Sequence, residues 1–259
     1  MRSNDIASRI IYRDAHCVIV NKIAGEAVEG ARAGMADLPR LISAELALSP
    51  PLPAKHLLAL PAAAHRLDVP VSGCVVFALT QTAIASLNAA FSGGIVEKRY
   101  WAIVELPKST TPFAAFPESG EMVHWIRFES KRNKSTAFDE PGSGRKKAVL
   151  RYRLVGSGRD YLFLEIETVT GRHHQIRAQL QRAGLHIKGD LKYGARRSEK
   201  NGGIRLHARS LSFPAFGDSA GDRVADCRIS VQADPPLRDN LWLAFEEAFG
   251  AVSCPAALS

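Results

Sequence analysis

One segment of the chain, residues 65–73, carries the side chains best suited to chemistry. It reads HRLDVPVSG and is followed at once by the apolar run 74–79, which is typical of a buried strand. We therefore expect the carboxylate of Asp68 and the guanidinium of Arg66 in a loop at the edge of a sheet. An ionised carboxylate can act as a nucleophile or as a general base. A structural ion pair or a capped turn uses the same residue types, so spacing alone does not decide.

Three further stretches group polar side chains in a way that could form a site. The first, EKRYWAIV at 97–104, reads as a strand in which Lys98 and Tyr100 share one face. The second, GRHHQIR at 171–177, reads as the start of a helix. The third joins GDLKYG at 189–194 to LHA at 206–208. Taken alone, the strand at 97–104 is more typical of a half-buried strand with a tyrosine in the core than of a site.

These segments together resemble the RluA-type pseudouridine synthases. The family signature H-R-L-D-x-x-T-S-G is met at 65–73, with Val71 in place of the threonine. The signatures K-x-Y-x-A-x-V, G-R-x-H-Q-I-R, G-D-x-x-Y-G and L-H-A-x-x-L-x-F-P follow in the family's order. Near the N-terminus, VNKIAG at 20–25 is similar to V-x-K-P-A-G, with Ile23 in place of the proline. The resemblance covers residues 10–214.

The resemblance implies an enzyme that isomerises uridine to pseudouridine within structured ribosomal or transfer RNA. The bond from C1′ of the ribose to N1 of uracil is broken, the base turns, and C1′ is joined to C5. No redox change takes place, so we expect no cofactor and no metal. Asp68 would be the catalytic carboxylate, as a nucleophile or as the base that removes the C2′ proton. Tyr100 would stack on the extruded base, and Arg177 would pair with Asp68.

The resemblance also implies contacts with RNA. Arg66 would fill the space that the extruded uridine leaves and would hold phosphate. The further RNA contacts that we expect are His65, Lys98, Arg172, His174 and Gln175. A purely structural role is equally open for Arg172 and Gln175.

Two other functions use the same residues. An RNA-binding protein of the same fold could lack catalysis, although the joint presence of Asp68, Tyr100 and Arg177 argues against it. A nucleoside hydrolase or transferase could use the same carboxylate on free uridine. A metal site is not favoured, because the histidines form neither an H-x-x-x-H nor an H-E-x-x-H pair.

Composition fits a nucleic-acid partner. The 259 residues carry a formal net charge of +8, which favours a polyanionic ligand but is also found in ordinary basic proteins. The four cysteines form no C-x-x-C pair, and no apolar run reaches the roughly 18 residues of a membrane-spanning helix. We expect a soluble cytoplasmic monomer that needs no protein partner.

The order of the elements predicts an α+β fold, with a central, mostly antiparallel mixed sheet flanked by helices and loops. The resemblance adds a pseudouridine synthase fold with an active-site cleft across the sheet. It predicts one catalytic domain over 1–259 without an S4 domain. Strands are expected within 10–20 and at 74–79, 98–105, 150–155, 161–168, 206–211 and 223–231, and helices at 36–48, 81–91, 172–182 and 239–249. We expect residues 30–64 to be a connector. The basic group Arg145, Lys146 and Lys147 lies in either a solvated hairpin or an RNA-contacting arm.

Overall fold

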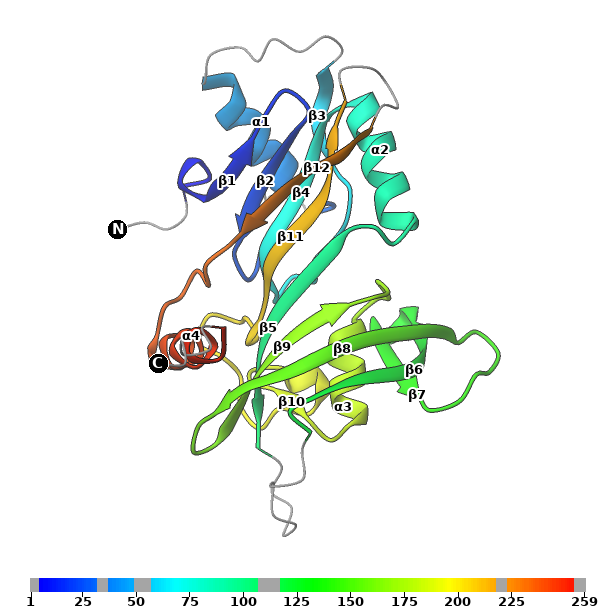
Figure 1. Cartoon of the computed structure of the whole chain (residues 1–259), viewed down its shortest axis with the longest axis vertical. Coiled ribbons are helices and arrows are strands. Elements are labelled where there is room, and N and C mark those ends of the chain that lie inside the picture. Colours follow the sequence, from blue (N-terminus) through cyan, green and yellow to red (C-terminus); the bar gives the residue numbers. More distant parts are fainter. Residues whose placement is uncertain (1–4, 32–36, 49–56, 107–116, 218–222, 254–259) are drawn as a thin grey trace, which may run out of the picture. The chain divides into compact units, whose positions relative to one another are not determined.

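The computed structural model describes residues 5–31, 37–48, 57–106, 117–217 and 223–253. The chain divides into two compact units, Met1–Lys98 with Ala208–Pro236 and Arg99–His207 with Leu237–Ser259 (Figure 1). In the part that is described, no helix combines the length and the apolar character that crossing a membrane requires.

The first unit is a sheet with two helices. Its strands are β1 (Ile10–Arg13), β2 (Cys17–Lys22), β3 (Leu57–Ala63), β4 (Ser72–Thr80), β11 (Leu206–Phe216), whose first two residues belong to the second unit, and β12 (Arg223–Gln232). The order is β1-β2-β4-β11, with β3 paired to β4 and β12 paired to β11. The β1–β2, β2–β4, β3–β4 and β11–β12 pairings are antiparallel.

Helix α2 (Gln81–Ser92) covers the core of the first unit, and α1 (Leu38–Leu48) packs beside β3 (Figure 1). Thr80 caps α2, because its hydroxyl accepts a hydrogen bond from the Ala83 amide at 3.2 Å. Leu87 of the helix packs into one cluster with Val76 of β4 and Phe213 of β11. The predicted strand, cap and helix at 74–91 are therefore confirmed.

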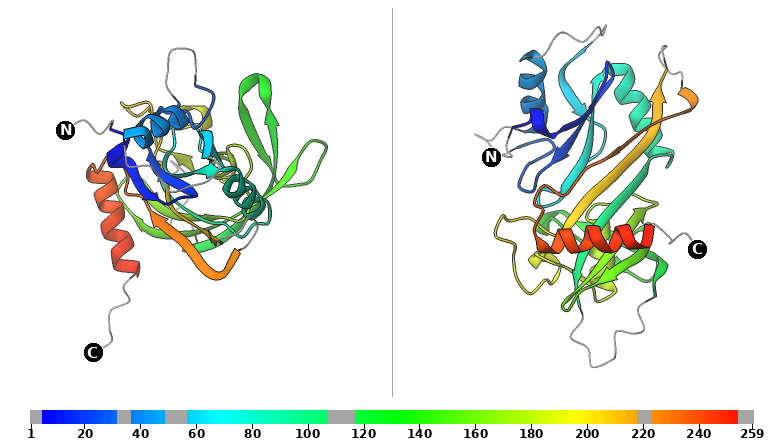
Figure 2. Two further views of the ribbon diagram at one scale, coloured as in Figure 1. Left: turned by 90° about the horizontal axis from the view of Figure 1, so that it is seen from above. Right: turned by 60° about the vertical axis from the view of Figure 1, so that its left-hand side comes forward.

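The second unit is an antiparallel sheet with one helix packed on each face. Its strands are β5 (Glu97–Glu105), which begins in the first unit, β6 (Ser119–Glu129), β7 (Lys134–Phe138), β8 (Lys146–Ser157), β9 (Tyr161–Thr168) and β10 (His186–Ile187). The order is β5-β9-β8-β6-β7, and β10 pairs with β5. Figure 2 shows the β6–β7 hairpin in green and the terminal helix in red.

Helices α3 (Gln175–Arg182) and α4 (Asn240–Ser253) pack on opposite faces of this sheet. Trp101 of β5 and Phe163 of β9 contact Phe245 of α4. Ile126 of β6 packs with Ala178 of α3. The strand registers place these two groups on opposite sides, because side chains alternate along a strand and paired residues share a side.

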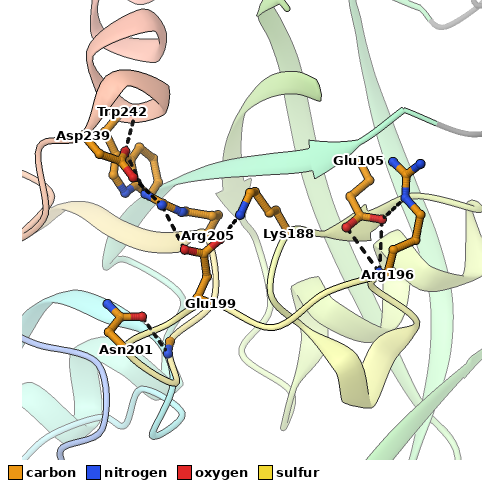
Figure 3. A network of polar contacts seen from close by, with 9 residues as sticks. Glu105, Lys188, Arg196, Glu199, Asn201, Arg205, Asp239 and Trp242 are labelled. Carbon is orange, nitrogen blue, oxygen red and sulfur yellow. Dashed lines mark hydrogen bonds and ion pairs between the residues drawn. The ribbon is translucent and has the colours of Figure 1, made fainter. Parts of the chain in front are cut away.

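A buried ion-pair network joins α4 to the segment that follows β10 (Figure 3). Arg205 donates to the carboxylates of Glu199 at 2.9 Å and of Asp239 at 3.0 Å. Asp239 also accepts from the Trp242 amide at 3.2 Å, which caps α4. Lys188 pairs with Glu199. Helix α4 is therefore held in place by ion pairs as well as by its aromatic core contacts.

The α+β class and the mostly antiparallel pairing are confirmed, and two local expectations are wrong. Helix α3 begins at Gln175 and not at residue 172, because His174 has a left-handed backbone with φ of 53°. Part of the expected connector at 30–64 is strand β3. Its Pro61 is tolerated because the register of β3 on β4 shifts between Leu57 and Ala62.

Candidate active site

In the first unit, Asp68 lies in a tight turn between β3 and β4. The Val71 amide donates to the Asp68 carbonyl at 3.0 Å, and the Gly25 amide donates to the Val69 carbonyl at 2.8 Å. Leu67 is buried beneath the turn, Asp68 is partly buried, and Arg66 is exposed. The backbone of the turn is therefore anchored at Asp68 and at the residue after it.

A buried lysine ties this turn to β2. Lys22 is 0% exposed, and its ammonium donates to the carbonyls of Asp68 at 3.3 Å, Val69 at 3.0 Å, Val71 at 2.6 Å and Ile23 at 3.1 Å. Burial lowers the pKa of Lys22 to about 8, although Glu26 and Asp68 act in the opposite direction. From the residue types alone, no role was predicted for Lys22. The V-x-K signature at 20–22 was the signal for it.

The Val71 and Gly73 positions of the signature have backbone explanations. The shortest Lys22 bond is to the Val71 carbonyl, which any residue supplies, so valine in place of threonine leaves this contact intact. Gly73 has φ of +118°, and a Cβ there would lie 2.5 Å from the Ala208 nitrogen. Only glycine allows the β11 backbone to approach this closely.

The two other candidates of the first unit, His65 and Lys98, pack against Phe91. The His65 ring stacks on Phe91 with centroids 4.8 Å apart, and its Nε2 accepts from the Val76 amide at 3.2 Å. Burial, and then Lys98, lower the pKa of His65 to about 3, so the ring is neutral. The Lys98 ammonium lies 5.9 Å from the Phe91 centroid, and burial lowers its pKa. His65 is thus engaged in packing within its own unit.

In the second unit, Arg177 is buried at the start of α3 and paired with a carboxylate. It is 5% exposed, and its Nε and Nη2 donate to Asp190 at 2.7 and 2.8 Å. Its guanidinium carbon lies 4.8 Å from the centroid of the Tyr193 ring. A bidentate pair of this kind fixes the plane of the guanidinium. Asp190 and Tyr193 were not among the predicted site residues, although both belong to the G-D-x-x-Y-G signature.

Tyr193 continues this network to the loop before α3. Its hydroxyl receives a hydrogen bond from the Ser135 amide at 2.8 Å and contacts Nδ1 of His174 at 2.9 Å. Burial, and then Arg177, lower the pKa of His174 to about 2. His174 is therefore a neutral, buried part of the support for Arg177.

Gln175 and Arg172 shape the same loop. The Gln175 side-chain oxygen accepts from the Thr170 hydroxyl at 2.7 Å and from the Arg172 amide at 2.9 Å, and its nitrogen donates to the Val149 carbonyl at 3.0 Å. Arg172 is exposed, and its Nε donates to the Lys147 carbonyl at 3.0 Å. Of the two roles left open, these bonds favour the structural role for Gln175.

Tyr100 lies on the face of the sheet that carries α3. It is paired with Ile166 of β9, which is paired with Tyr152 of β8. Tyr152 shares its side with Ala148, and Ala148 packs against Ala178 of α3. Tyr100 and Arg177 are therefore on the same face, and the opposite face carries α4.

The comparisons with known proteins agree with one another. Residues 16–182 match the family model described as RNA pseudouridylate synthase. The chain is 30% identical over 211 residues to an uncharacterised RNA pseudouridine synthase of Zymomonas mobilis, covering 80% of this chain and 88% of the relative. It is also 30% identical over 217 residues to the ribosomal large subunit pseudouridine synthase D of the same organism. That match covers 81% of this chain but only 65% of the relative.

Two solved structures share the fold. Human RNA pseudouridylate synthase domain containing 4 superposes with a TM-score of 0.67 at 20% identity, covering 96% of this chain and 95% of the other. Human RNA pseudouridylate synthase domain containing 1 gives a TM-score of 0.62 at 20% identity, covering 93% and 94%. At this identity the likeness establishes the fold, and the predicted fold class is confirmed.

Proposed function

Because the chain belongs to the RNA pseudouridylate synthase family, whose members are isomerases, we propose that it converts specific uridines to pseudouridine in structured ribosomal or transfer RNA. The observation that carries this proposal is the turn of Asp68. Three lysine hydrogen bonds and two backbone hydrogen bonds hold this turn, although it lies in a loop. Such preorganisation is what a catalytic carboxylate requires.

In this proposal Asp68 is the carboxylate on which the reaction depends. It acts either as a nucleophile or as the base that removes the C2′ proton. The bond from C1′ to N1 breaks, the base turns, and the bond from C1′ to C5 forms. C5 then loses its proton and N1 gains one, so that the product is an isomer of the substrate. No oxidant, reductant or cofactor enters this balance.

We assign Tyr100 and Arg177 to the same centre. Tyr100 stacks on the extruded base, and its hydroxyl is suited to removing the C5 proton. Asp190 binds Nε and Nη2 of Arg177 and so fixes its guanidinium, and the pairing of Arg177 with Asp68 that the resemblance implies is part of this proposal. The common face of Tyr100 and Arg177 in the second unit supports this assignment.

The remaining predicted residues divide into two groups. Arg66, Lys98 and Arg172 are proposed as RNA contacts, with Arg66 in the space vacated by the uridine. Extruding a base costs a few kcal/mol, which such contacts offset. His65, His174 and Gln175 hold the surrounding loops. We also propose that residues 1–259 act as a single catalytic domain.

The experiment is to map pseudouridine in ribosomal and transfer RNA treated with wild-type protein, with Asp68→Asn and with Asp160→Asn. Asp160 is an exposed carboxylate in the β8–β9 turn and provides a matched control. We expect Asp68→Asn to form no pseudouridine while its RNA affinity falls less than about tenfold, or roughly 1.4 kcal/mol. Asp160→Asn should behave as wild type. Substantial turnover by Asp68→Asn would remove Asp68 from the mechanism, and an inactive wild type that still binds RNA would indicate a non-catalytic RNA-binding protein.

A further inference from the structure

An exposed aromatic pair lies at the end of the β6–β7 hairpin. Phe128 is 47% exposed, whereas Ile126, two residues earlier on the same side of β6, is buried. The Phe128 ring lies against His173, with centroids 4.1 Å apart and planes at 50°. A large apolar ring left half in water forgoes a substantial part of the roughly 1.5–3 kcal/mol that its burial would contribute.

The His173 ring of the pair is supported by two neighbouring side chains. The His173 ring lies 3.8 Å from the His174 ring, and its Nδ1 contacts the Ser135 hydroxyl at 3.1 Å. His174 is itself buried and bonded to Tyr193. His174 and Ser135 therefore hold the His173 ring in place beside Phe128. A ligand that stacks on these two rings has little additional structure to order.

Cations lie on the segments next to the pair. Lys134 and Lys192 lie at the Tyr193 side, where the Lys134 ammonium is 5.0 Å from the Tyr193 centroid and the Lys192 ammonium donates to the Asn133 carbonyl at 3.1 Å. Arg172 precedes His173 in the chain. Among the described residues, no carboxylate forms an ion pair with these three side chains. The neighbouring Glu129 contacts Arg132 at 3.7 Å.

We propose that Phe128 and His173 form a stacking platform for an unpaired nucleotide of the substrate RNA. The identification of the ligand as an RNA nucleotide rests on the proposed function, whereas the platform itself rests on the ring geometry and the cations. Rings stack on any base, and the neighbouring ammonium and guanidinium groups suit the phosphates on either side. His173 lies four residues before Arg177, and both Phe128 and Arg177 lie on the α3 face. The platform thus binds RNA on the face of the second unit's sheet that also carries Arg177.

The test uses a single-stranded RNA oligonucleotide with one 2-aminopurine, whose fluorescence falls when the base stacks. Phe128→Ala should weaken binding about 5- to 150-fold, which corresponds to roughly 1–3 kcal/mol, and should abolish the quenching. Phe128→Trp should retain both, whereas Phe128→Leu should behave like the alanine variant, because it keeps apolar area without a ring. Val123→Ala is the matched control, since Val123 is an exposed apolar residue of the same strand on the opposite face.

Thermal unfolding of every variant checks that the fold is retained, which is expected because Phe128 and Val123 are both exposed. Unchanged affinity and quenching in Phe128→Ala would overturn the platform, as would an equal effect of Val123→Ala. Binding and quenching are measured without turnover. A failure of Asp68→Asn to abolish pseudouridine formation would therefore reject the proposed catalysis and leave this test unaffected.

Discussion

The two faces of the sheet in the second unit differ in how their charged side chains are paired and buried. On the α4 face, basic and acidic side chains alternate across neighbouring strands, so that Arg151 contacts both Glu121 at 3.1 Å and Glu167 at 3.8 Å. Arg153 pairs with Glu165 on the same face. On the α3 face, the buried pair of Arg177 with Asp190 lies next to His174 and Tyr193, and an exposed pair joins Arg182 of α3 to Asp139.

This difference separates two uses of basic residues that the net charge of +8 cannot separate. A cation paired with a carboxylate on an exposed face contributes little to stability and little to phosphate binding. A buried ion pair fixes the orientation of both side chains, and removing one partner strongly lowers the free energy of unfolding. The position of the acidic side chains, more than the number of basic ones, indicates where RNA and catalysis are to be sought.

The largest effect is expected from breaking the buried pair. Arg177→Met should lower the free energy of unfolding by about 3–5 kcal/mol, because Asp190 would lose its bidentate partner inside the protein. Arg151→Met on the other face should cost no more than about 1 kcal/mol, because Arg151 and Glu121 are 59% and 46% exposed. Chemical denaturation of both variants measures the difference.

Arg177→Lys sharpens the same comparison. A lysine keeps the charge but cannot make two parallel hydrogen bonds to Asp190. It should recover part of the stability and only part of the single-turnover rate. Equal losses in Arg177→Met and Arg151→Met would contradict the distinction between the two faces.

The second effect concerns catalysis on the α3 face. Tyr100→Phe removes a hydroxyl that we assign to the C5 proton, and a general base contributes about 10²- to 10⁴-fold. The single-turnover rate of pseudouridine formation should fall within that range. Tyr161→Phe is the same change at β9, where Tyr161 shares the α4 side with Phe163. Its rate should stay within about twofold of wild type.

RNA that contains 5-fluorouridine tests the order of steps. Fluorine cannot leave as a proton, so Tyr100→Phe should still convert this RNA to a rearranged product if the hydroxyl acts only at the end. Loss of that conversion would place Tyr100 before the glycosidic bond is broken.

Local sequence patterns predicted several elements, whereas the contacts that hold Arg177 and Lys22 depend on the fold. The run at 74–79 with Thr80 gave a strand and a capped helix, because alternation, capping and apolar length are local properties. The partners of Arg177 could not be obtained in this way. Asp190 lies 13 residues further on, and only the fold brings the two together. Lys22 is similar, because its contacts with residues 68–71 span nearly 50 positions of the chain.

The start of α3 shows why local rules failed there. A helical pattern does run through residues 172–182, but His174 adopts a left-handed backbone that ends any helix at that point. The Gln175 side chain then bonds the Arg172 amide, which a helix would leave exposed. The tertiary bond of His174 to Tyr193 outweighs its local helix preference.

A third prediction extends the comparison to the buried charge of the first unit. Lys22 faces Glu26, Asp68 and Arg9, and burial lowers its pKa to about 8 from 10.5. As pH rises through 8, the ammonium becomes an amine with fewer donors for the turn of Asp68. The single-turnover rate should then fall by up to about tenfold per pH unit.

Over the same pH range the free energy of unfolding should increase, whereas the rate falls. Between pH 8 and 10.5 the unfolded chain still holds the Lys22 proton and the folded chain has lost it, so the free energy of unfolding rises with pH. Lys22→Met should lose both dependences. Rate profiles of wild type and Lys22→Met that coincide above pH 8 would show that this lysine does not position Asp68.

The smallest effect is expected from the basic group that follows the hairpin. Arg145 packs on the Phe138 ring at 3.7 Å and donates to the Glu140 carbonyl, so it holds its own turn. Lys146 and Lys147 are exposed, and within the described residues no carboxylate pairs with either, so they are the side chains available to phosphate. Reversing both to glutamate should weaken RNA binding severalfold and reduce the slope of log affinity against log salt by roughly 0.7 to 0.9 for each phosphate that is no longer neutralised. Reversing Arg151, which is already paired with glutamates, should change that slope less. Binding isotherms at several salt concentrations measure both slopes, and equal changes would mean that pairing with carboxylates does not determine which cations bind RNA.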